Sequence, residues 1–146
     1  MTHVRQQLRE RIATTLNGLP STGRNVFRSR ARRLERNETP ALFIYTRTES
    51  DDPLTGTEPR VLQRELTVYV EVVALVPEPD DVIDAACAEV EQALANDRRL
   101  GGLARDLLLV ATSMEFSDDA EAPGGSARLE YRIRYMTTDA APDVAL

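Results

Sequence analysis

The stretch Ala127-Arg-Leu-Glu-Tyr-Arg-Ile-Arg-Tyr-Met-Thr137 alternates strictly between two kinds of side chain. One set is apolar or small and points one way: Ala127, Leu129, Tyr131, Ile133 and Tyr135. The other set is charged and points the opposite way: Arg128, Glu130, Arg132 and Arg134. A period of two over this length predicts a β-strand with one buried face and one wet, charged face. The fold must therefore supply a second layer that covers the apolar side of a sheet.

Two amphipathic helices are predicted to form that second layer. Residues 2–17 carry a single apolar stripe, with Thr2 as the expected N-cap and Asn17-Gly18 as the stop signal. The stripe consists of Val4, Leu8, Ile12 and Leu16. A second helix is expected to begin at Asp80, because apolar residues then recur at helical spacing as far as Leu94. Acidic residues fill its first turn, where the helix dipole favours anions.

Three further strands are predicted from apolar or alternating runs. The runs are residues 41–46, 61–76 and 107–116. In the longest run Arg64 departs from the otherwise apolar pattern of its face. Residues 48–60 and 117–126 are acidic and contain Pro and Gly, which predicts two loops. Residues 21–39 fit either a short strand or an exposed basic segment.

The expected fold is α+β, a mostly antiparallel sheet with two main helices packed on one face. A length of 146 residues favours a single domain, which we assign to residues 1–137. Residues 138–146 are expected to form a flexible C-terminal tail. No apolar run approaches the ~20 residues that a membrane-spanning helix needs, so no membrane partner is expected.

The chain carries no recognisable catalytic, nucleotide-binding or metal-binding motif. The single cysteine, Cys87, lies among alanines and is interpreted as a buried filler. The single histidine, His3, is not expected to bind a metal or to act in catalysis. The pairs Asp51-Asp52 and Asp118-Asp119 fit solvated loops, and Asp80-Asp81 fits a helix cap, better than a cation site. We therefore expect no enzyme activity, no cofactor and no metal.

Charge is distributed unevenly along the chain. All 18 basic residues are arginine. Residues 1–36 contain nine arginines and two acidic residues, a net charge of +7. Residues 37–146 contain nine arginines and 22 acidic residues, a net charge of −13. A monomer polarised in this way can stack on copies or partners of opposite sign. The basic cluster consists of Arg24, Arg28, Arg30, Arg32, Arg33 and Arg36. Three interpretations of it stay open: a solvated surface, protein docking, and binding to a phosphate backbone, which the net charge of −6 disfavours.

The order and spacing of these elements resemble the tail terminator proteins of long-tailed phages, the lambda-like minor tail protein U family. Four stretches carry the resemblance, which runs from residue 4 to about residue 136. They are Leu8-Arg-Glu-Arg-Ile12; Val26-Phe27 followed by Pro40-Ala-Leu-Phe-Ile-Tyr45; Glu65-Leu-Thr-Val-Tyr-Val-Glu-Val72 followed by the helix that Asp80 opens; and Thr112-Ser-Met114 followed by an acidic loop and residues 127–135. The long loop at 48–60 falls where this family has a protruding, flexible loop.

The resemblance implies a structural virion protein at the head-proximal end of the tail, assembled in the host cytoplasm. Proteins of this kind form a hexameric ring that caps the growing tail tube, ends its polymerisation and meets the head-completion protein. The implied partners are further copies of the chain, the tail-tube protein and a head-completion or connector protein. Nucleic acid is implied only as DNA that passes through the ring.

A ring closes when one patch of a subunit meets a different patch on the next copy. The charge split makes the basic segment 24–36, the two acidic loops and the charged face of residues 127–137 the candidate contacts, with a plain solvent face as the alternative. The candidate interface residues are Arg28, Arg30, Arg32, Arg33, Asp51, Asp52, Arg128, Arg132 and Arg134. A head–tail connector (neck) protein is the alternative within the assembly class. A small nucleic-acid-binding α+β domain is the alternative outside it.

Overall fold

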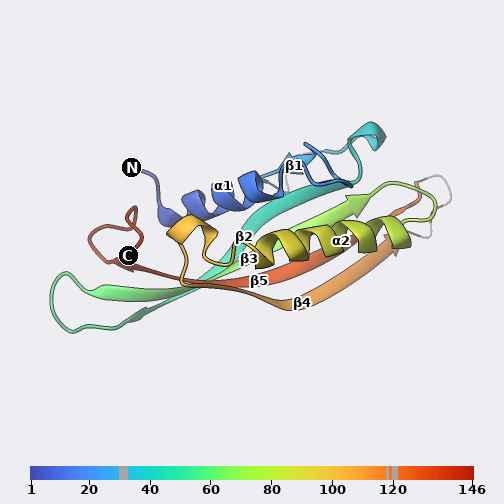
Figure 1. Cartoon of the computed structure of the whole chain (residues 1–146). Coiled ribbons are helices and arrows are strands. Elements are labelled where there is room, and N and C mark those ends of the chain that lie inside the picture. Colours follow the sequence, from blue (N-terminus) through green and yellow to red (C-terminus); the bar gives the residue numbers. More distant parts are fainter. Residues whose placement is uncertain (30–32, 118, 120–121) are drawn as a thin grey trace.

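The computed structural model describes residues 1–29, 33–117, 119 and 122–146, which form a five-stranded sheet with two helices on one face (Figure 1). The strands are β1 Val26–Phe27, β2 Ala41–Pro53, β3 Val61–Ala74, β4 Asp106–Ser117 and β5 Gly124–Thr138. Their order in the sheet is β1-β2-β3-β5-β4, and each neighbouring pair is antiparallel except β1 and β2. The predicted α+β fold with a mostly antiparallel sheet is confirmed. Of the two interpretations of residues 21–39, the short strand is present as β1.

Two helices cover the apolar face of the sheet, as the sequence predicts. They are α1 Val4–Leu16 and α2 Asp80–Ala95, and two short 3-10 helices are η1 Arg36–Glu38 and η2 Leu100–Gly102. The predicted stripe of α1 is buried along its whole length. The buried residues of α2 are Ile83, Ala86, Cys87, Val90 and Leu94. Both stripes join the apolar residues of the strands in one core, so a single hydrophobic layer holds helices and sheet together.

The alternation predicted for the last strand is confirmed. The five apolar or small residues of β5 are each at most 4% exposed, whereas Arg128, Arg132 and Arg134 are exposed. β5 lies between β3 and β4, so Ile133 pairs with Leu66 on one side and with Leu107 on the other. One side of this strand therefore lies at the centre of the core, and its other side forms part of the exposed face of the sheet.

α2 begins at Asp80, as predicted, but the caps of both helices differ from the predicted ones. His3, not Thr2, caps α1, and its Nδ1 accepts a hydrogen bond from the backbone N–H of Arg5 at 3.1 Å. The reason is that the helix begins at Val4, so Thr2 lies one residue too early to be the N-cap. At α2 the N-cap position is Pro79, which has no side-chain cap. Asp80 and Asp81 lie in the first turn, where they interact with the helix dipole instead of capping the helix.

β2 is longer than predicted, and the expected loop at 48–60 is wrong in its first part. The strand continues to Pro53, which leaves residues 54–60 as the connection to β3. A register shift between Thr46 and Glu49 breaks the alternation and hides the strand in the sequence. Beyond the shift, Asp51 pairs with Arg64, so the strand continues beside a polar partner. The resulting β2–β3 hairpin extends past both helices at one end of the molecule (Figure 1).

Residues 138–146 lie against the domain near the start of α1. The backbone N–H of Val4 donates to the carbonyl of Pro142 at 3.0 Å, and Gln7 Nε2 donates to the carbonyl of Asp143 at 2.9 Å. The N–H of Leu146 donates to the carbonyl of Met136 at 2.9 Å. Both chain termini therefore lie at the same end of the molecule (Figure 1). The flexibility expected of this segment stays a prediction.

Candidate functional site

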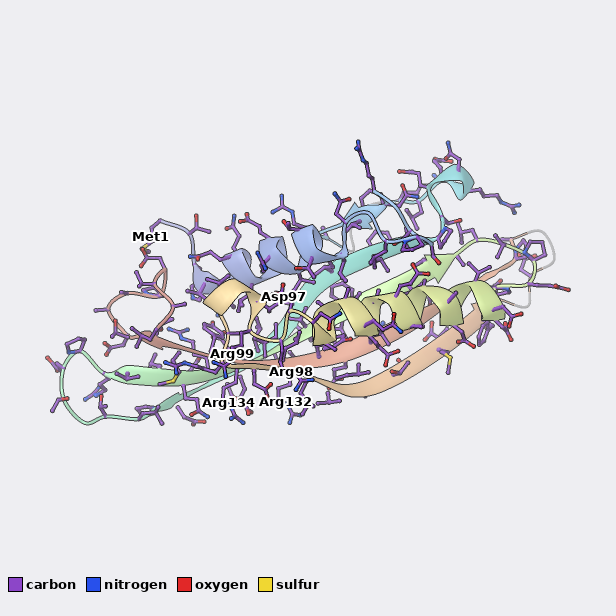
Figure 2. The ribbon with its side chains drawn as sticks, viewed as in Figure 1. Met1, Asp97, Arg98, Arg99, Arg132 and Arg134 are labelled. Carbon is purple, nitrogen blue, oxygen red and sulfur yellow. The ribbon has the colours of Figure 1, made fainter. Side chains whose placement is uncertain are left out.

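Three of the candidate interface arginines line the face of β5 that is opposite the helices. Arg132 and Arg134 project from that side of the sheet (Figure 2). The guanidinium of Arg128 lies 5.2 Å from the centre of the Tyr69 ring, and Arg134 Nη2 lies 3.7 Å from Glu65 Oε1. Contacts between groups this exposed contribute little to stability. The outer face is thus a wet surface of arginines and aromatic rings that can meet another molecule.

The two candidate acids lie at the end of β2 and differ in their surroundings. Both are exposed, but Asp51 Oδ1 also lies 3.5 Å from Arg64 Nη1. Burial raises the pKa of Asp51, and the hydrogen bond and charge of Glu49 raise it further. Asp51 therefore faces solvent and also contacts the network around Arg64.

Arg28, the first candidate arginine of the basic segment, lies near the opposite end of β2, beside α1. Arg28 Nη1 donates to Glu10 Oε1 at 3.1 Å, and the two side chains are 54% and 43% exposed, so the pair is a surface contact. Arg33 is exposed. Arg30 and Arg32 lie outside the described residues. The sheet thus has acids at one end of β2 and an arginine near the other.

An open groove of about 890 Å³ separates α1 from β1 and the residues that follow it. Its lining residues are Gln6, Arg9, Glu10, Ala13, Thr14, Asn17, Val26, Phe27, Arg28 and Ser29. Apolar side chains from both elements lie among charged ones in this lining. An open groove with a mixed lining suits side chains of a partner protein better than a small enclosed ligand.

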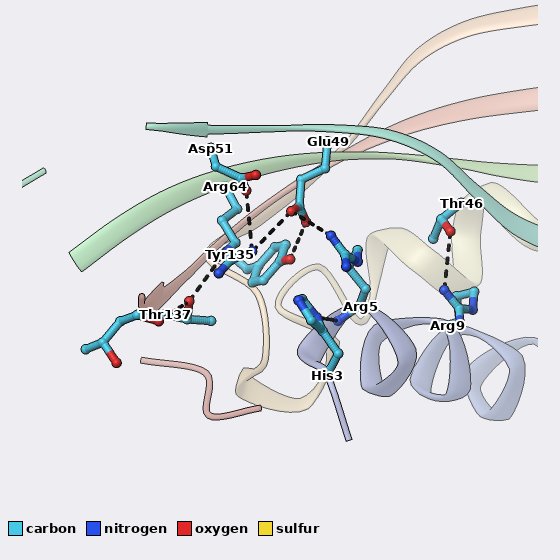
Figure 3. A network of polar contacts seen from close by, with 10 residues as sticks. His3, Arg5, Arg9, Thr46, Glu49, Asp51, Arg64, Tyr135 and Thr137 are labelled. Carbon is cyan, nitrogen blue, oxygen red and sulfur yellow. Dashed lines mark hydrogen bonds and ion pairs between the residues drawn. The ribbon is translucent and has the colours of Figure 1, made fainter. Parts of the chain in front are cut away.

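A buried ion network lies where the end of β2 meets α1 and β5, and sequence reasoning missed it (Figure 3). The carboxylate of Glu49, 6% exposed, accepts hydrogen bonds from Arg5 Nη1 at 2.9 Å and Arg64 Nη1 at 3.2 Å. The hydroxyl of Tyr135 also donates to Glu49. Arg64 Nε donates to Thr137 Oγ1 at 3.1 Å. The one signal in the sequence was Arg64 itself, a charge on the apolar face of its strand.

The network holds Glu49 in its charged form. Burial alone would raise the pKa of this carboxyl group, but its hydrogen bonds with Asp51 and Tyr135 lower it. The charges of Arg5 and Arg64 lower it further, so the pKa of Glu49 lies below its ordinary value. The same arginines, after burial, lower the pKa of His3. The network is a compensated buried charge that fixes the hairpin to α1 and β5.

β4 is a free edge of the sheet, which the sequence did not indicate because local period does not reveal strand order. Among the described residues, no strand pairs with its outer side. The strand carries no charge from Leu107 to Met114, and Leu108 and Met114 are each 55% exposed. Phe116 is 48% exposed. Edge strands are usually protected by charge, proline or shortness, and this run of β4 lacks all three.

A smaller cavity of about 390 Å³ lies between α2 and β4. Its lining residues are Glu91, Leu94, Ala95, Arg98, Asp106, Leu107, Leu108, Leu109 and Tyr131. Tyr131 is 4% exposed, and its hydroxyl has no hydrogen-bond partner in the described part of the chain. Burial raises the pKa of this tyrosine. The cavity adjoins the free edge of the sheet and adds to the apolar surface there.

The described residues offer little reactive chemistry. Within residues 1–29, 33–117, 119 and 122–146, no group of three or more His, Cys, Asp or Glu side chains is arranged to hold a metal ion. Burial raises the pKa of Cys87 to about 11, so its thiol stays protonated near neutral pH. No helix in the described part of the chain is long and apolar enough to span a bilayer.

The family model for phage minor tail protein U matches residues 2–135. The chain belongs to this family of phage structural tail proteins, which confirms the resemblance. No curated protein matches the chain. A solved chain described as "Virion of native gene transfer agent (GTA) particle" is similar, with 15% identity over 90% of each chain and a TM-score of 0.44.

Proposed function

We propose that this protein caps the head-proximal end of the phage tail tube, ends its polymerisation and joins the tail to the head-completion complex. It acts as a ring of identical subunits, a hexamer by resemblance to the family, and resides in the virion after assembly in the host cytoplasm. It is not an enzyme. The observation that carries the proposal is the match to phage minor tail protein U across residues 2–135, nearly the whole sheet and both helices.

Physical features of the chain support an assembly role. The net +7 of residues 1–36 against the net −13 of residues 37–146 gives each copy surfaces of opposite sign. Such surfaces favour a head-to-tail contact between identical subunits, which closes into a ring if the rotation between copies allows it. The overall charge of −6 disfavours sequence-independent DNA binding as the main function.

The test is co-assembly of the purified protein with tail-tube protein from the same phage. Mass measurement and negative-stain images with and without the tube protein should show rings at tube ends and tubes of limited length. Portal-ring or adaptor protein in place of tube protein is the control, and addition to that ring alone would favour a neck protein. A monomer that never adds to tube ends would overturn the proposal. Steeply salt-dependent binding to DNA without ring formation would favour a nucleic-acid-binding domain.

A further inference from the structure

The two edges of the sheet can be compared row by row, where a row is a line of residues paired from strand to strand. The register shifts between Thr46 and Glu49 in β2 and between Leu109 and Ala111 in β4, so the rows compared lie on either side of these shifts. Ser50 of β2 pairs with Glu65, Glu65 with Arg134, and Arg134 with Asp106 of β4. The row that holds Ser50 at one edge therefore holds Asp106 at the other. In the same way the row of Met114 runs through Ala127 and Val72 to Leu42, and then to Val26 of β1.

Strand directions decide how a second copy would fit. β2, β3, β5 and β4 are successively antiparallel, so β4 runs antiparallel to β2. A copy shifted along the sheet without being turned over would place its β2 beside β4 of the first copy in the antiparallel sense. Among the described residues, β1 pairs with β2 at Leu42 and Phe43, so the part from Ile44 to Pro53 is the edge open to strand pairing there. Antiparallel addition of this kind extends the backbone hydrogen bonding of a sheet.

Charges along the two edges have opposite signs at corresponding rows. Two exposed cations lie at the start of β4, namely Arg105 just before the strand and Arg134 of β5, the partner of the half-buried Asp106. The matching end of β2 carries Asp51 and Asp52. The end of β4 is acidic, with Glu115 exposed, whereas Arg24 and Arg28 flank β1 at the matching end of the other edge. Complementary charges at both ends favour one register over a slipped one.

At the end of β4 that carries Glu115, the shapes of the two edges also complement each other. Met114 and Phe116 lie on the helix side of β4, since they pair with Ala127 and Gly125, and they are 55% and 48% exposed. The row of Met114 ends at Val26, which lines the open groove of about 890 Å³ between α1 and β1. Exposed apolar side chains at one edge thus correspond to a groove at the other.

We propose that the outer edge of β4 in one copy pairs with residues 44–50 of β2 in the next copy, and that Met114 and Phe116 enter that copy's groove between α1 and β1. The contact joins two different patches, so it is head-to-tail and repeats around a closed assembly. This inference rests on the proposed ring and assigns its subunit contact. It also explains why a long, uncharged edge strand stays unprotected in the monomer.

A disulfide cross-link tests the register. The experiment uses Ser50→Cys and Asp106→Cys in a Cys87→Ala background, assembled with tube protein and then oxidised. Within one copy these positions lie three strand spacings apart, about 14 Å, which is too far for a disulfide. The double variant should give a covalent ladder that ends at the size of the ring. Mixing the two single variants should give only dimers, and each single variant alone should give none.

Two outcomes would overturn the contact. A ladder missing from rings that still cap tubes would remove this inference and leave the proposed function standing. Dimers from Asp106→Cys alone would show that β4 pairs with β4 of another copy about a two-fold axis. If the wild-type protein neither forms rings nor caps tubes, the proposed function fails first and the inference fails with it.

A matched pair of variants tests the edge without cysteines. Leu108→Lys puts a charge near the start of the uncharged run, and Val144→Lys puts one at a position of similar exposure, 55% against 51%, outside the contact. We expect Leu108→Lys to weaken ring formation about tenfold or more and Val144→Lys to leave it unchanged. Equal ring formation by the two variants, with unfolding curves like wild type, would contradict the contact.

Discussion

Arg64 is the residue whose position in its strand is hardest to reconcile with a hydrophobic face. Its side chain is 8% exposed and lies 3.2 Å from the carboxylate of Glu49, itself 6% exposed. Removing one partner of a buried pair leaves the other charge uncompensated, which is far more costly than removing a surface pair. The network of Figure 3 is therefore the place where single substitutions should have the largest electrostatic effect on stability.

Arg64→Met should lower the free energy of unfolding by about 3 kcal/mol, because Glu49 stays buried with one cation fewer. Arg134→Met is the matched control, since Arg134 pairs with Glu65 at 3.7 Å on the exposed face. We expect that control to cost at most about 1 kcal/mol. Urea unfolding of the monomer measures both values. Equal costs for the two variants would show that burial of the Glu49–Arg64 pair has no energetic consequence.

The acid dependence of Glu49→Gln follows from the direction of the pKa shift. The pKa of Glu49 is lowered from 4.5, so the stability it contributes is present above about pH 4.5 and is lost as pH falls through the folded-state pKa. The raised pKa of Asp51 acts in the opposite sense and reduces this benefit at neutral pH. We therefore expect the deficit of Glu49→Gln relative to wild type to be present near about pH 7 and to shrink toward about pH 3.

Urea unfolding of wild type and Glu49→Gln at both pH values measures this deficit. Glu65→Gln, on the exposed face, is the control and should stay within about 0.5 kcal/mol of wild type at either pH. A deficit for Glu49→Gln that is the same in acid as at neutral pH would mean that the charge of Glu49 does not stabilise the fold.

At the scale of elements, β5 separates the core from the exposed face residue by residue. Ile133 is fully buried between β3 and β4, whereas Arg132 beside it in the chain is exposed. Ile133→Ala should cost about 2–5 kcal/mol because it leaves a cavity in the core. Arg132→Ala should change the stability of the isolated monomer by less than about 0.5 kcal/mol. Chemical denaturation of the two variants measures the contrast, and similar costs would contradict the assigned faces.

The same scale shows which parts of the fold the sequence predicts. β5 and both helices follow from period alone, because each element buries one regular face. β2 beyond Thr46 does not, because the register shift before Glu49 interrupts the alternation and Asp51 and Asp52 have the composition of a loop. These acids lie in a strand because Arg64 and Gln63 of β3 are their partners. That pairing depends on the tertiary structure, which the local sequence pattern does not show. The same holds for the free edge of β4.

At the scale of the whole molecule, the candidate interface residues fall into three separate places. Asp51 and Asp52 lie at one end of β2, Arg28 lies near the other end, and the arginines of β5 lie on the outer face. The sequence identified them by charge alone, and charge does not tell which of them belong to one surface. Such separation suits a subunit with different neighbours on different sides, as a ring contact and a tube contact would require.

Charge reversal in the basic segment tests whether this polarity drives assembly. The variant combines Arg28→Glu, Arg30→Glu and Arg32→Glu, and it replaces three cations by three anions in the part of the chain with net +7. We expect it to lose ring formation and tube capping at low salt, where charged surfaces are least screened. The same three positions changed to Lys keep the charge and should preserve assembly. Monomer unfolding is measured as the control, and loss of the exposed Arg28–Glu10 pair should itself cost at most about 1 kcal/mol. Rings and capped tubes formed as readily by the reversed variant as by the Lys variant would show that the basic segment is solvated surface.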